Sequence, residues 1–480
     1  MRVDENGQPN TVAVAVSAAV NKPANPSTVL AVLCVAAFMA SLDLFIVNVA
    51  FDDIGHSFSG VALSDLSWVL NGYAIVYAAA LVPLGRLADR YGRKAGFVGG
   101  LALFTAASAA CAISDGVWML VAFRALQAIG AAALTPTSLG LLLTATPPER
   151  RIRAVRIWAA SGALASAAGP VVGGLLVEAS WRWVFLVNVP VGIAAIVVAL
   201  RHVPDSRDTT VTQIPDLLGA AVLAIAIGAL AYGLVEGPGR GWAARTVLTA
   251  FVLAALGVVG FWIRTTHHPS PVVGPALLRV RAFAWSNVTA VLFSAAFAAG
   301  LLSIVLWLQQ VWSYSAIRTG LAIAPGPVMV PLSVLLGSRY LRRLPPGLVA
   351  SAGCFLFACG SGLTGLSVGR VPHYAAEVLP GWLLAGVGVG LALPTTLTAA
   401  TADLPPSRNA TGSAVVTMSR QIGSVLGVGG FVAVVGTTTG FAQAHHAFQH
   451  GWLVITLVGL AGAVTAVGMT PAVAAPSETR

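Results

Sequence analysis

Two oppositely charged residues, Asp43 and Arg124, lie deep within long apolar stretches of the sequence. A charged side chain at the centre of a bilayer costs roughly 2.5–3.5 kcal/mol, so each must face protein and find a partner. Both lie about eight residues from the same end of their stretches, a depth of ~12 Å in spanning helices. We therefore expect an ion pair. Its carboxylate can accept a proton, because desolvation favours the neutral form; the alternative is a permanent pair that only joins two helices.

The elements that must hold this pair are membrane-spanning helices. Of the 480 residues, 57% are hydrophobic and 9% are charged, against ~25% charged in soluble proteins. A span needs ~20 mostly apolar residues, and the sequence predicts an all-α integral membrane protein with 14 transmembrane helices. The predicted spans are residues 28–50, 66–85, 95–114, 117–143, 153–178, 183–201, 214–235, 244–264, 282–308, 318–340, 347–368, 374–401, 409–436 and 450–472.

The basic residues indicate which side of the membrane the chain ends face. The formal net charge is +10. With both termini inside, 20 of the 27 Lys and Arg residues fall in inner loops and tails, the asymmetry typical of cytoplasmic loops. We therefore expect cytoplasmic termini. Because topology accounts for the positive charge, no nucleic-acid partner is predicted.

An internal repeat divides the chain. Residues 130–174 and 388–432 match at a constant offset, such as Pro136 with Pro394 (394 − 136 = 258). Spans 4 and 5 thus recur eight helices later, so two extra helices lie between two six-helix halves. Parallel repeats are typical of transporters with a substrate path between the halves; chance similarity among Gly-, Ala- and Pro-rich helices is the alternative. The predicted parts are a disordered tail (1–27), a first half (28–203), a linker with two helices (204–281), a second half (282–472) and a tail (473–480).

Polar and aromatic side chains within the spans are candidates for substrate contacts. An apolar cavity with a few polar groups suits amphipathic, drug-like molecules. For any single aromatic residue, core packing or anchoring at the lipid interface is the alternative. The candidates are Asn48, Asn71, Tyr73, Tyr77, Gln127, Trp158, Gln309 and Gln310.

A second buried cation, Arg420, stands where the first repeat has Gly162. We expect its side chain to extend toward the cytoplasm or to bond carbonyl groups at a helix end. A direct part in coupling is the alternative.

Two motifs concern the helix packing. The stretch GRLADRYGRK, residues 85–94, is predicted to be a cytoplasmic loop in which Gly85 and Gly92 make tight turns and Asp89 caps a helix or binds neighbouring arginines. The alternative is that its basic residues only determine the orientation of the chain in the membrane. The stretch GALASAAGPVVGG, residues 162–174, sets small residues four apart on one helical face, which allows close packing.

These stretches resemble motifs of the major facilitator superfamily. GRLADRYGRK is similar to its loop motif, RALQAIGAAALTP (124–136) to the span-4 motif of proton-coupled members, and GALASAAGPVVGG to the span-5 antiporter motif. LDLFIVNVAF (42–51) resembles the span-1 motif of fourteen-span drug:proton antiporters. LVEGPGRGW (234–242) and SRQIGSVLGV (419–428) are similar to stretches in actinobacterial antibiotic-resistance exporters such as the methylenomycin exporter.

The resemblance implies a major facilitator fold and a role for particular residues. It implies that Arg124 takes part in proton coupling with Asp43. It also implies that the first motif latches the two halves in the outward-facing state, and that the second forms a tight, kinked contact that favours antiport. The residues concerned are Gly85, Asp89, Arg90, Gly92 and Arg93 in the first motif and Gly162, Gly169, Pro170, Gly173 and Gly174 in the second.

The sequence and the resemblance together predict a proton-driven exporter of drug-like or antibiotic compounds in a bacterial cytoplasmic membrane. Export of one endogenous metabolite or self-made antibiotic, uptake by symport, and a transport-dead scaffold are the alternatives. No GxxxxGK[ST] motif for ATP occurs. We predict no enzyme activity, metal or cofactor, and a monomer whose partners are lipid, protons and a small amphipathic substrate.

Overall fold

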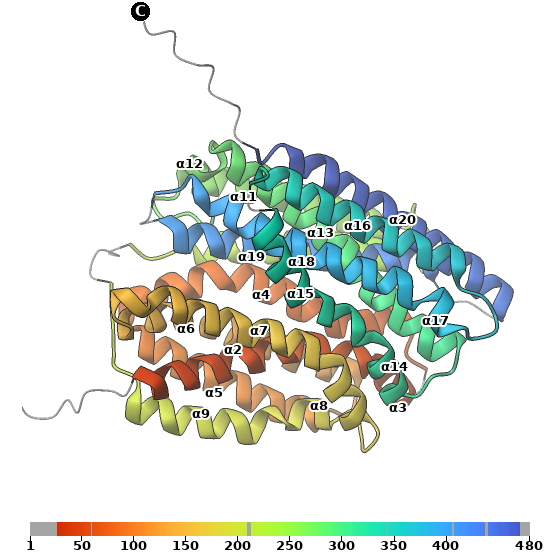
Figure 1. Cartoon of the computed structure of the whole chain (residues 1–480), viewed down its shortest axis with the longest axis horizontal. Helices are drawn as coiled ribbons and strands as arrows, with labels where there is room; N and C mark the ends of the chain where they lie inside the picture. The colour runs from red at the N-terminus through yellow and green to blue at the C-terminus, as the bar shows by residue number, and fades with distance from the viewer. Residues whose placement is uncertain are drawn as a thin grey trace, which may run out of the picture.

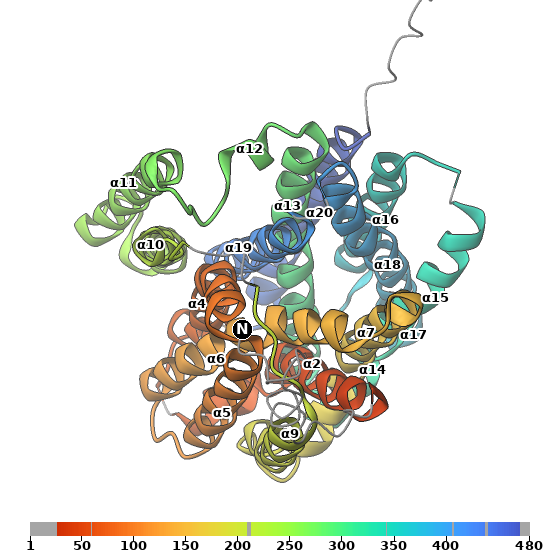
Figure 2. The ribbon, with the colours of Figure 1, turned by 90° about the vertical axis from the view of Figure 1, so that its left-hand side faces the viewer.

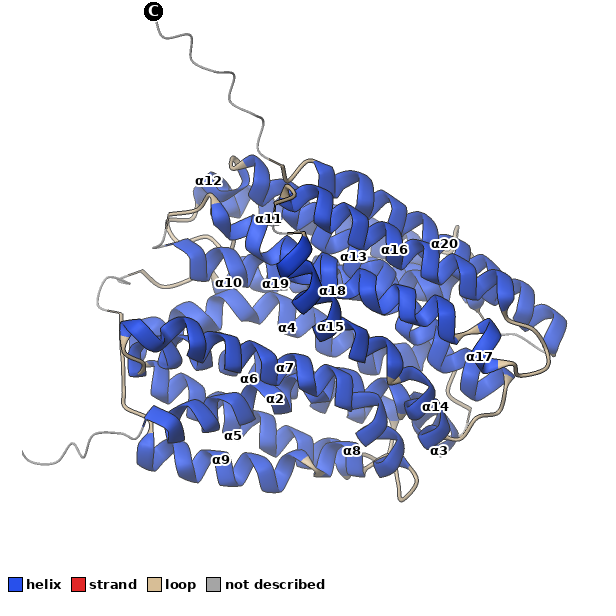
Figure 3. Cartoon of the chain, in the orientation of Figure 1, coloured by secondary structure: helices blue, strands red, loops and turns tan. Residues whose placement is uncertain are grey.

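The structure, a computed structural model, describes residues 26–470 except 59, 209–212, 342, 406–407 and 437–439. This part of the chain is a bundle of helices without strands (Figures 1 and 3). By length and composition, 14 helical segments can cross a membrane. They are α2 (Pro26–Val49), α4 (Leu63–Tyr91), α5 (Arg93–Ala112), α6 (Val117–Ala145), α7 (Pro148–Val177), α8 with α9 (Trp183–Leu186, Asn188–His202), α10 (Leu217–Arg240), α11 (Arg245–His267), α13 (Arg281–Leu306), α14 with α15 (Ala316–Ile323, Pro325–Tyr340), α16 (Pro346–Ser367), α18 (Leu379–Ala402), α19 (Asn409–Val435) and α20 (Phe441–Val467).

The last span differs most from the prediction. It begins at Phe441 and not at residue 450, because polar residues such as His445 lower the hydropathy of its first turns without preventing a helix. His445 bonds the carbonyl oxygen of Val368 at 3.1 Å, and Phe448 packs edge-on against Trp307. Three short helices, α3 (Phe51–Ser57), α12 (Pro275–Leu278) and α17 (Tyr374–Glu377), complete the described elements.

The predicted tails lie almost wholly outside the described residues. Of residues 1–27, only Pro26 and Ser27 are described, and they begin α2. The span predicted to start at residue 374 is divided into α17 and α18.

The same helix pairings occur in both parts of the internal repeat. Helix α2 packs on α7 as α13 packs on α19, and α5 packs on α6 as α16 packs on α18. Equivalent glycines make close approaches in the two parts. A Cβ at Gly130 would lie 2.6 Å from the backbone nitrogen of Phe104, and one at Gly388 would lie 2.6 Å from that of Phe357. Since these backbones touch, any larger residue would push the helices apart.

Helices α10 and α11 lie beside the rest of the bundle (Figure 2). Helix α10 contacts α4 and α19, and α11 packs on α10. The outer face of α11 exposes large apolar side chains, including Val252 and Leu256, which are 58% and 64% exposed. Such a face suits lipid.

The two ends of the bundle differ. We call the end at which α2 begins the basic end, because it carries Arg86, Arg90, Arg93 and Lys94, and the opposite end the far end. At the far end a π-helical turn, Trp307–Val311, follows α13. From this turn, Gln309 donates to the carbonyl oxygen of Val49 (2.9 Å), and Gln310 donates to Asp52 (3.0 Å). Hydrogen bonds from the π-helical turn to α2 and α3 thus hold the two repeats together at this end.

Candidate functional site: a cavity beside a buried ion pair

Asp43 and Arg124 form an ion pair inside the first repeat. An Nη atom of Arg124 lies 2.5 Å from a carboxylate oxygen of Asp43, and the two side chains are 1% and 0% exposed respectively. The pair joins α2 to α6, as the equal depth of the two residues predicts. Its burial makes the attraction strong and the separation of either partner costly.

Neutral side chains from three helices complete the network. Gln127 donates to Asp43 (2.8 Å) and accepts from Arg124 (2.7 Å). Ser108 accepts from Gln127 at 2.8 Å, and Asn188 donates to Asp43 at 3.4 Å. Both carboxylate oxygens of Asp43 are therefore hydrogen-bonded. Ser108 and Asn188 were not predicted from the sequence, where polar residues within apolar spans are the only signal for them.

The guanidinium group of Arg124 also contacts an aromatic ring of α4. Its guanidinium carbon lies 4.1 Å from the ring centroid of Tyr73, a favourable cation–π contact. Tyr73 and Tyr77 stack with centroids 6.0 Å apart and planes at 10°, so they share a face of α4. Arg124 and both tyrosines line a large cavity.

The cavity has a volume of about 560 Å³ and lies between the two repeats. Its wall comes from α2, α4, α6 and α7 on one side and from α13, α15, α16, α18 and α19 on the other. Apolar side chains such as Phe297 and Phe357 make up most of the second wall. Among the described residues that line it, Arg124 and Arg420 are the charged ones. The size and the mostly apolar wall suit a drug-sized molecule.

Of the eight predicted substrate contacts, five line this cavity: Asn48, Asn71, Tyr73, Tyr77 and Trp158. Asn71 and Trp158 carry side-chain nitrogen or oxygen atoms that are buried without a hydrogen-bond partner among the described residues.

The other three predicted contacts do not line this cavity. Gln127 is fully buried behind the wall and bonds Asp43. Gln309 and Gln310 are at the far end, where the π-helical turn directs them to Val49 and Asp52.

The expectation for Arg420 is wrong. Its side chain neither extends to the basic end nor bonds a helix-end carbonyl group; it lines the cavity. Its Nε atom is buried and has no hydrogen-bond partner among the described residues. Arg420 lies 11 residues after Asn409, the first residue of α19 (420 − 409 = 11). This is a depth of ~16 Å, too deep for the side chain to leave the cavity wall.

The Major Facilitator Superfamily model matches residues 33–428. The chain belongs to this family. Its relatives include the Methylenomycin A resistance protein of Bacillus subtilis (strain 168), which is 34% identical over 84% of this chain and 86% of the relative. The protein of the same name from Streptomyces coelicolor is 31% identical over 89% of each chain. The Tetracenomycin C resistance and export protein of Streptomyces glaucescens is 30% identical over 84% of this chain and 74% of the relative.

Solved structures agree with the fold. A POT family transporter in complex with 5-aminolevulinic acid superposes with a TM-score of 0.68 at 16% identity, covering 92% of this chain and 96% of that one. The chain is thus an all-α integral membrane protein with the major facilitator fold. No group of three or more His, Cys, Asp or Glu residues that could hold a metal ion occurs in the described part of this major facilitator protein.

The small residues of α7 pack against α2. A Cβ at Gly169 would lie 2.7 Å from the Cβ of Phe45, one at Gly173 would lie 3.0 Å from Ile46, and one at Gly162 would lie 3.2 Å from the hydroxyl of Ser41. Close packing of this major facilitator motif is therefore confirmed.

The same helix contacts the second repeat at the far end. A Cβ at Gly174 would lie 2.7 Å from the carbonyl oxygen of Ala316 in α14. In return, a Cβ at Gly320 would overlap the carbonyl oxygen of Pro170. The backbones of α7 and α14 therefore meet directly at the far end.

The charged motif at residues 85–94 is helical and not a loop. Helix α4 runs to Tyr91 and α5 starts at Arg93, so Gly92 alone joins them, with φ = 134°. Only glycine adopts this backbone conformation readily. Gly85 makes no turn; it lies within α4, where a Cβ would meet Pro136 at 3.1 Å. Arg90 lies over the ring of Tyr91.

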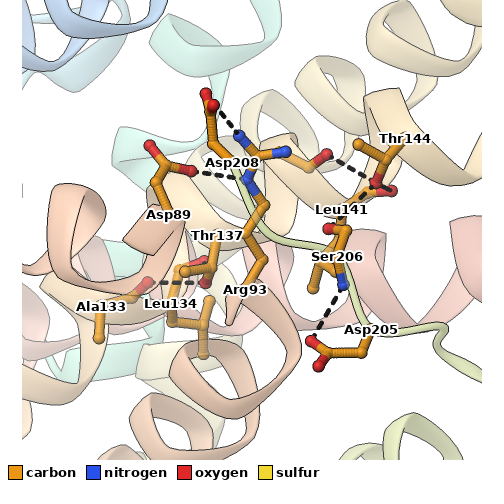
Figure 4. A network of polar contacts seen from close by, with 11 residues as sticks. Asp89, Arg93, Ala133, Leu134, Thr137, Leu141, Thr144, Asp205, Ser206 and Asp208 are labelled. Atoms are coloured by element: carbon orange, nitrogen blue, oxygen red, sulfur yellow. Dashed lines mark hydrogen bonds and ion pairs between the residues drawn. The ribbon is translucent and has the colours of Figure 1, made fainter. Parts of the chain in front are cut away.

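Asp89 binds Arg93 at 2.6 Å and does not cap α5. Figure 4 shows both side chains beside the segment that follows α9. Arg93 lies 4.0 Å from Asp208, its backbone nitrogen donates to Ser206 (2.8 Å), and that of Asp208 donates to Asp89 (2.8 Å). These contacts tie the α4–α5 junction to the start of the linker.

Proposed function

We propose that this protein exports drug-like or antibiotic compounds in exchange for protons, by alternating access of the cavity to the two sides of the membrane. The observation that carries the proposal is the double position of Arg124. It is the buried partner of Asp43, and it also faces the cavity. A molecule that enters the cavity and a proton that binds Asp43 therefore act on one guanidinium group.

The coupling follows from the charges of this pair. When Asp43 is ionised, it holds Arg124 and Gln127. Protonation removes its negative charge and with it most of the attraction. The guanidinium group then loses the carboxylate that positions it at the cavity wall, so protonation weakens substrate binding to Arg124. Conversely, a substrate that contacts the positioned Arg124 disfavours protonation of Asp43, because that position depends on the ionised carboxylate. Substrate and proton thereby oppose each other's binding, as exchange requires.

The names of the relatives support the direction and the substrate class. They include antibiotic resistance proteins and a resistance and export protein. The apolar wall and volume of the cavity fit such compounds. On this proposal the protein is a monomer in the bacterial cytoplasmic membrane, with its basic end and both termini on the cytoplasmic side, as the positive-inside rule favours.

Inside-out membrane vesicles test the proposal. They hold an acid interior, and candidate compounds are added outside while a pH-sensitive dye reports the gradient. We expect a transported compound to dissipate the gradient with the wild type and with Asp115→Asn, whose carboxylate is exposed. Asp43→Asn should not respond, because an amide cannot carry the proton. Equal responses of the wild type and Asp43→Asn would show that coupling does not use Asp43.

A further inference from the structure

The two charged residues of the cavity wall are in different electrostatic situations. Arg124 is neutralised by Asp43, whereas no described carboxylate lines the cavity beside Arg420. The cavity therefore carries one uncompensated positive charge. A buried guanidinium group without a counter-ion is costly, and this cost falls when an anion binds.

The position of Arg420 directs this charge toward the interior of the cavity. Gly162, its equivalent in the first repeat (420 − 258 = 162), lines the same cavity from α7. The same position of the repeat therefore carries no side chain on the α7 wall and a guanidinium group on the α19 wall. Thr417 and Ser424, about one turn away on α19, line the cavity with Arg420, which indicates that this face of the helix is turned inward.

Further hydrogen-bonding groups in the wall have no partner in the described structure. They are the indole nitrogen of Trp158, the hydroxyl of Tyr73 and the amide of Asn71, all of them on the first repeat. Buried polar atoms are normally bonded, so unpaired donors beside the cavity favour a ligand that brings acceptor atoms. Each of the three residues offers an N–H or O–H donor, as an anion requires.

We propose that Arg420 binds an anionic group of the substrate, and that the substrate is an amphipathic organic acid. The carboxylate or another delocalised oxyanion receives the N–H groups of Arg420, which suit such a group geometrically. The rings or chains of the molecule pack on the apolar wall, including Phe297, Phe357 and Trp382. This inference rests on the proposed export function and specifies its substrate class. A lipophilic cation is disfavoured, because it would face the uncompensated charge of Arg420.

The test uses equilibrium binding of three matched probes to the full-length protein in phosphatidylcholine nanodiscs at neutral pH. The probes are 1-pyrenebutyric acid, its methyl ester and a trimethylammonium analogue with the same ring and chain. Energy transfer from tryptophan to pyrene reports binding, with empty discs subtracted. We expect the wild type to bind the acid more tightly than the ester, and the ester more tightly than the cation.

Three variants identify the residue responsible. Arg420→Gln should lower the affinity for the acid roughly tenfold, the usual order for a charged hydrogen bond, and change that for the ester less than about twofold. Arg420→Lys should keep most of the acid affinity. Gln421→Glu, which adds a carboxylate to the cavity wall without changing its volume much, should lower it as Arg420→Gln does. Retained ester binding shows that each variant is folded.

Several results would overturn the proposal: no binding of the acid by the wild type, an equal effect of Arg420→Gln on acid and ester, or tighter binding of the cation. Loss of acid binding when the discs contain phosphatidylglycerol would assign Arg420 to a lipid headgroup instead. Since no gradient is present and Asp43 is unchanged, these results are independent of the proton-coupling test. If this binding test failed, the proposed export of neutral compounds would be unaffected.

Discussion

The two repeats supply opposite walls of one cavity but handle charge differently. In the first repeat, Asp43 and Arg124 neutralise each other within a network of amides and hydroxyls. In the second, Arg124 is replaced by Trp382 (382 − 124 = 258), whose indole nitrogen donates to the carbonyl oxygen of Ile323. The cation of the second wall, Arg420, has no such partner among the described residues.

The position equivalent to Asp43 is also apolar. Gly169 packs on Phe45 and Gly427 on Ala295, which relates α2 to α13 by 295 − 45 = 250 residues. Asp43 then corresponds to residue 293, a phenylalanine that packs edge-on against Phe357. One fold thus holds a polar network in one repeat and an aromatic cluster in the other. The two repeats therefore share their backbone packing but differ in the side chains that line each wall.

The largest loss of stability should come from breaking the Asp43–Arg124 pair in the wall of the first repeat. Arg124→Leu would leave Asp43 charged and buried, and we expect a loss of ~3–5 kcal/mol in stability. Thermal unfolding in detergent, followed by size-exclusion chromatography, measures this loss. The matched control is the double variant Asp43→Leu with Arg124→Leu, which should regain most of the stability yet remain inactive in the vesicle assay. A double variant no more stable than Arg124→Leu would contradict the assignment of the loss to the unpaired charge.

An intermediate effect is expected for a pair outside both walls. Asp216 precedes α10, accepts from the backbone nitrogen of Gly219 (2.7 Å) and binds Arg264 of α11 (2.6 Å). Asp216→Asn keeps a side-chain oxygen that can cap α10 but removes the charge that Arg264 binds, so it should cost ~1–2 kcal/mol. Burial acts to raise the pKa of the Asp216 carboxyl, but the hydrogen bonds from Arg264 and Gly219 outweigh it and hold that pKa below its usual range.

The sign of this pKa shift fixes the pH dependence. A carboxyl with a lowered pKa stabilises the folded state above its unfolded pKa of ~3.9, and this stabilisation disappears as the pH falls through the folded value. The unfolding temperatures of wild type and Asp216→Asn should therefore differ at neutral pH and converge in strong acid. A difference that is constant over this range would mean that the ionised carboxylate is not the stabilising group.

The smallest effect, and the one of opposite sign, should come from the second wall. Arg420→Leu removes a cation that has no described partner, so we expect no loss of stability and a gain of ~1 kcal/mol. The same thermal unfolding assay applies, with Arg420→Lys as the control that keeps the charge. Destabilisation comparable to that of Arg124→Leu would show that both walls depend on their charges alike, and the contrast between the repeats would be lost.

What could be predicted from the sequence follows from distances along single helices. The depth of Asp43 and Arg124 requires only a count of residues, and their pairing follows. Gln127, three residues after Arg124, shares its helical face, a signal that could have identified it as part of the network. Asn188 and Ser108 could not be identified, because their contact with the network depends on which helices are neighbours.

A high density of charge does not indicate a loop in this protein. The motif at residues 85–94 is charged, yet helices α4 and α5 extend through it because residues at the basic end need no apolar surroundings. Gln309 and Gln310 lie at the end of a span, where a π-helical turn directs them to Val49 and Asp52. The cavity-facing position of Arg420 required knowledge of which face of α19 meets the other repeat.

The lack of a partner at Arg420 has an evolutionary consequence. A residue held in a network can change only together with its neighbours, since each substitution leaves another group unsatisfied. Arg420 can be replaced in a single mutational step that leaves no orphaned charge behind. Descendants of this protein can therefore acquire new substrate preferences through the second repeat while the first keeps its ion pair unchanged.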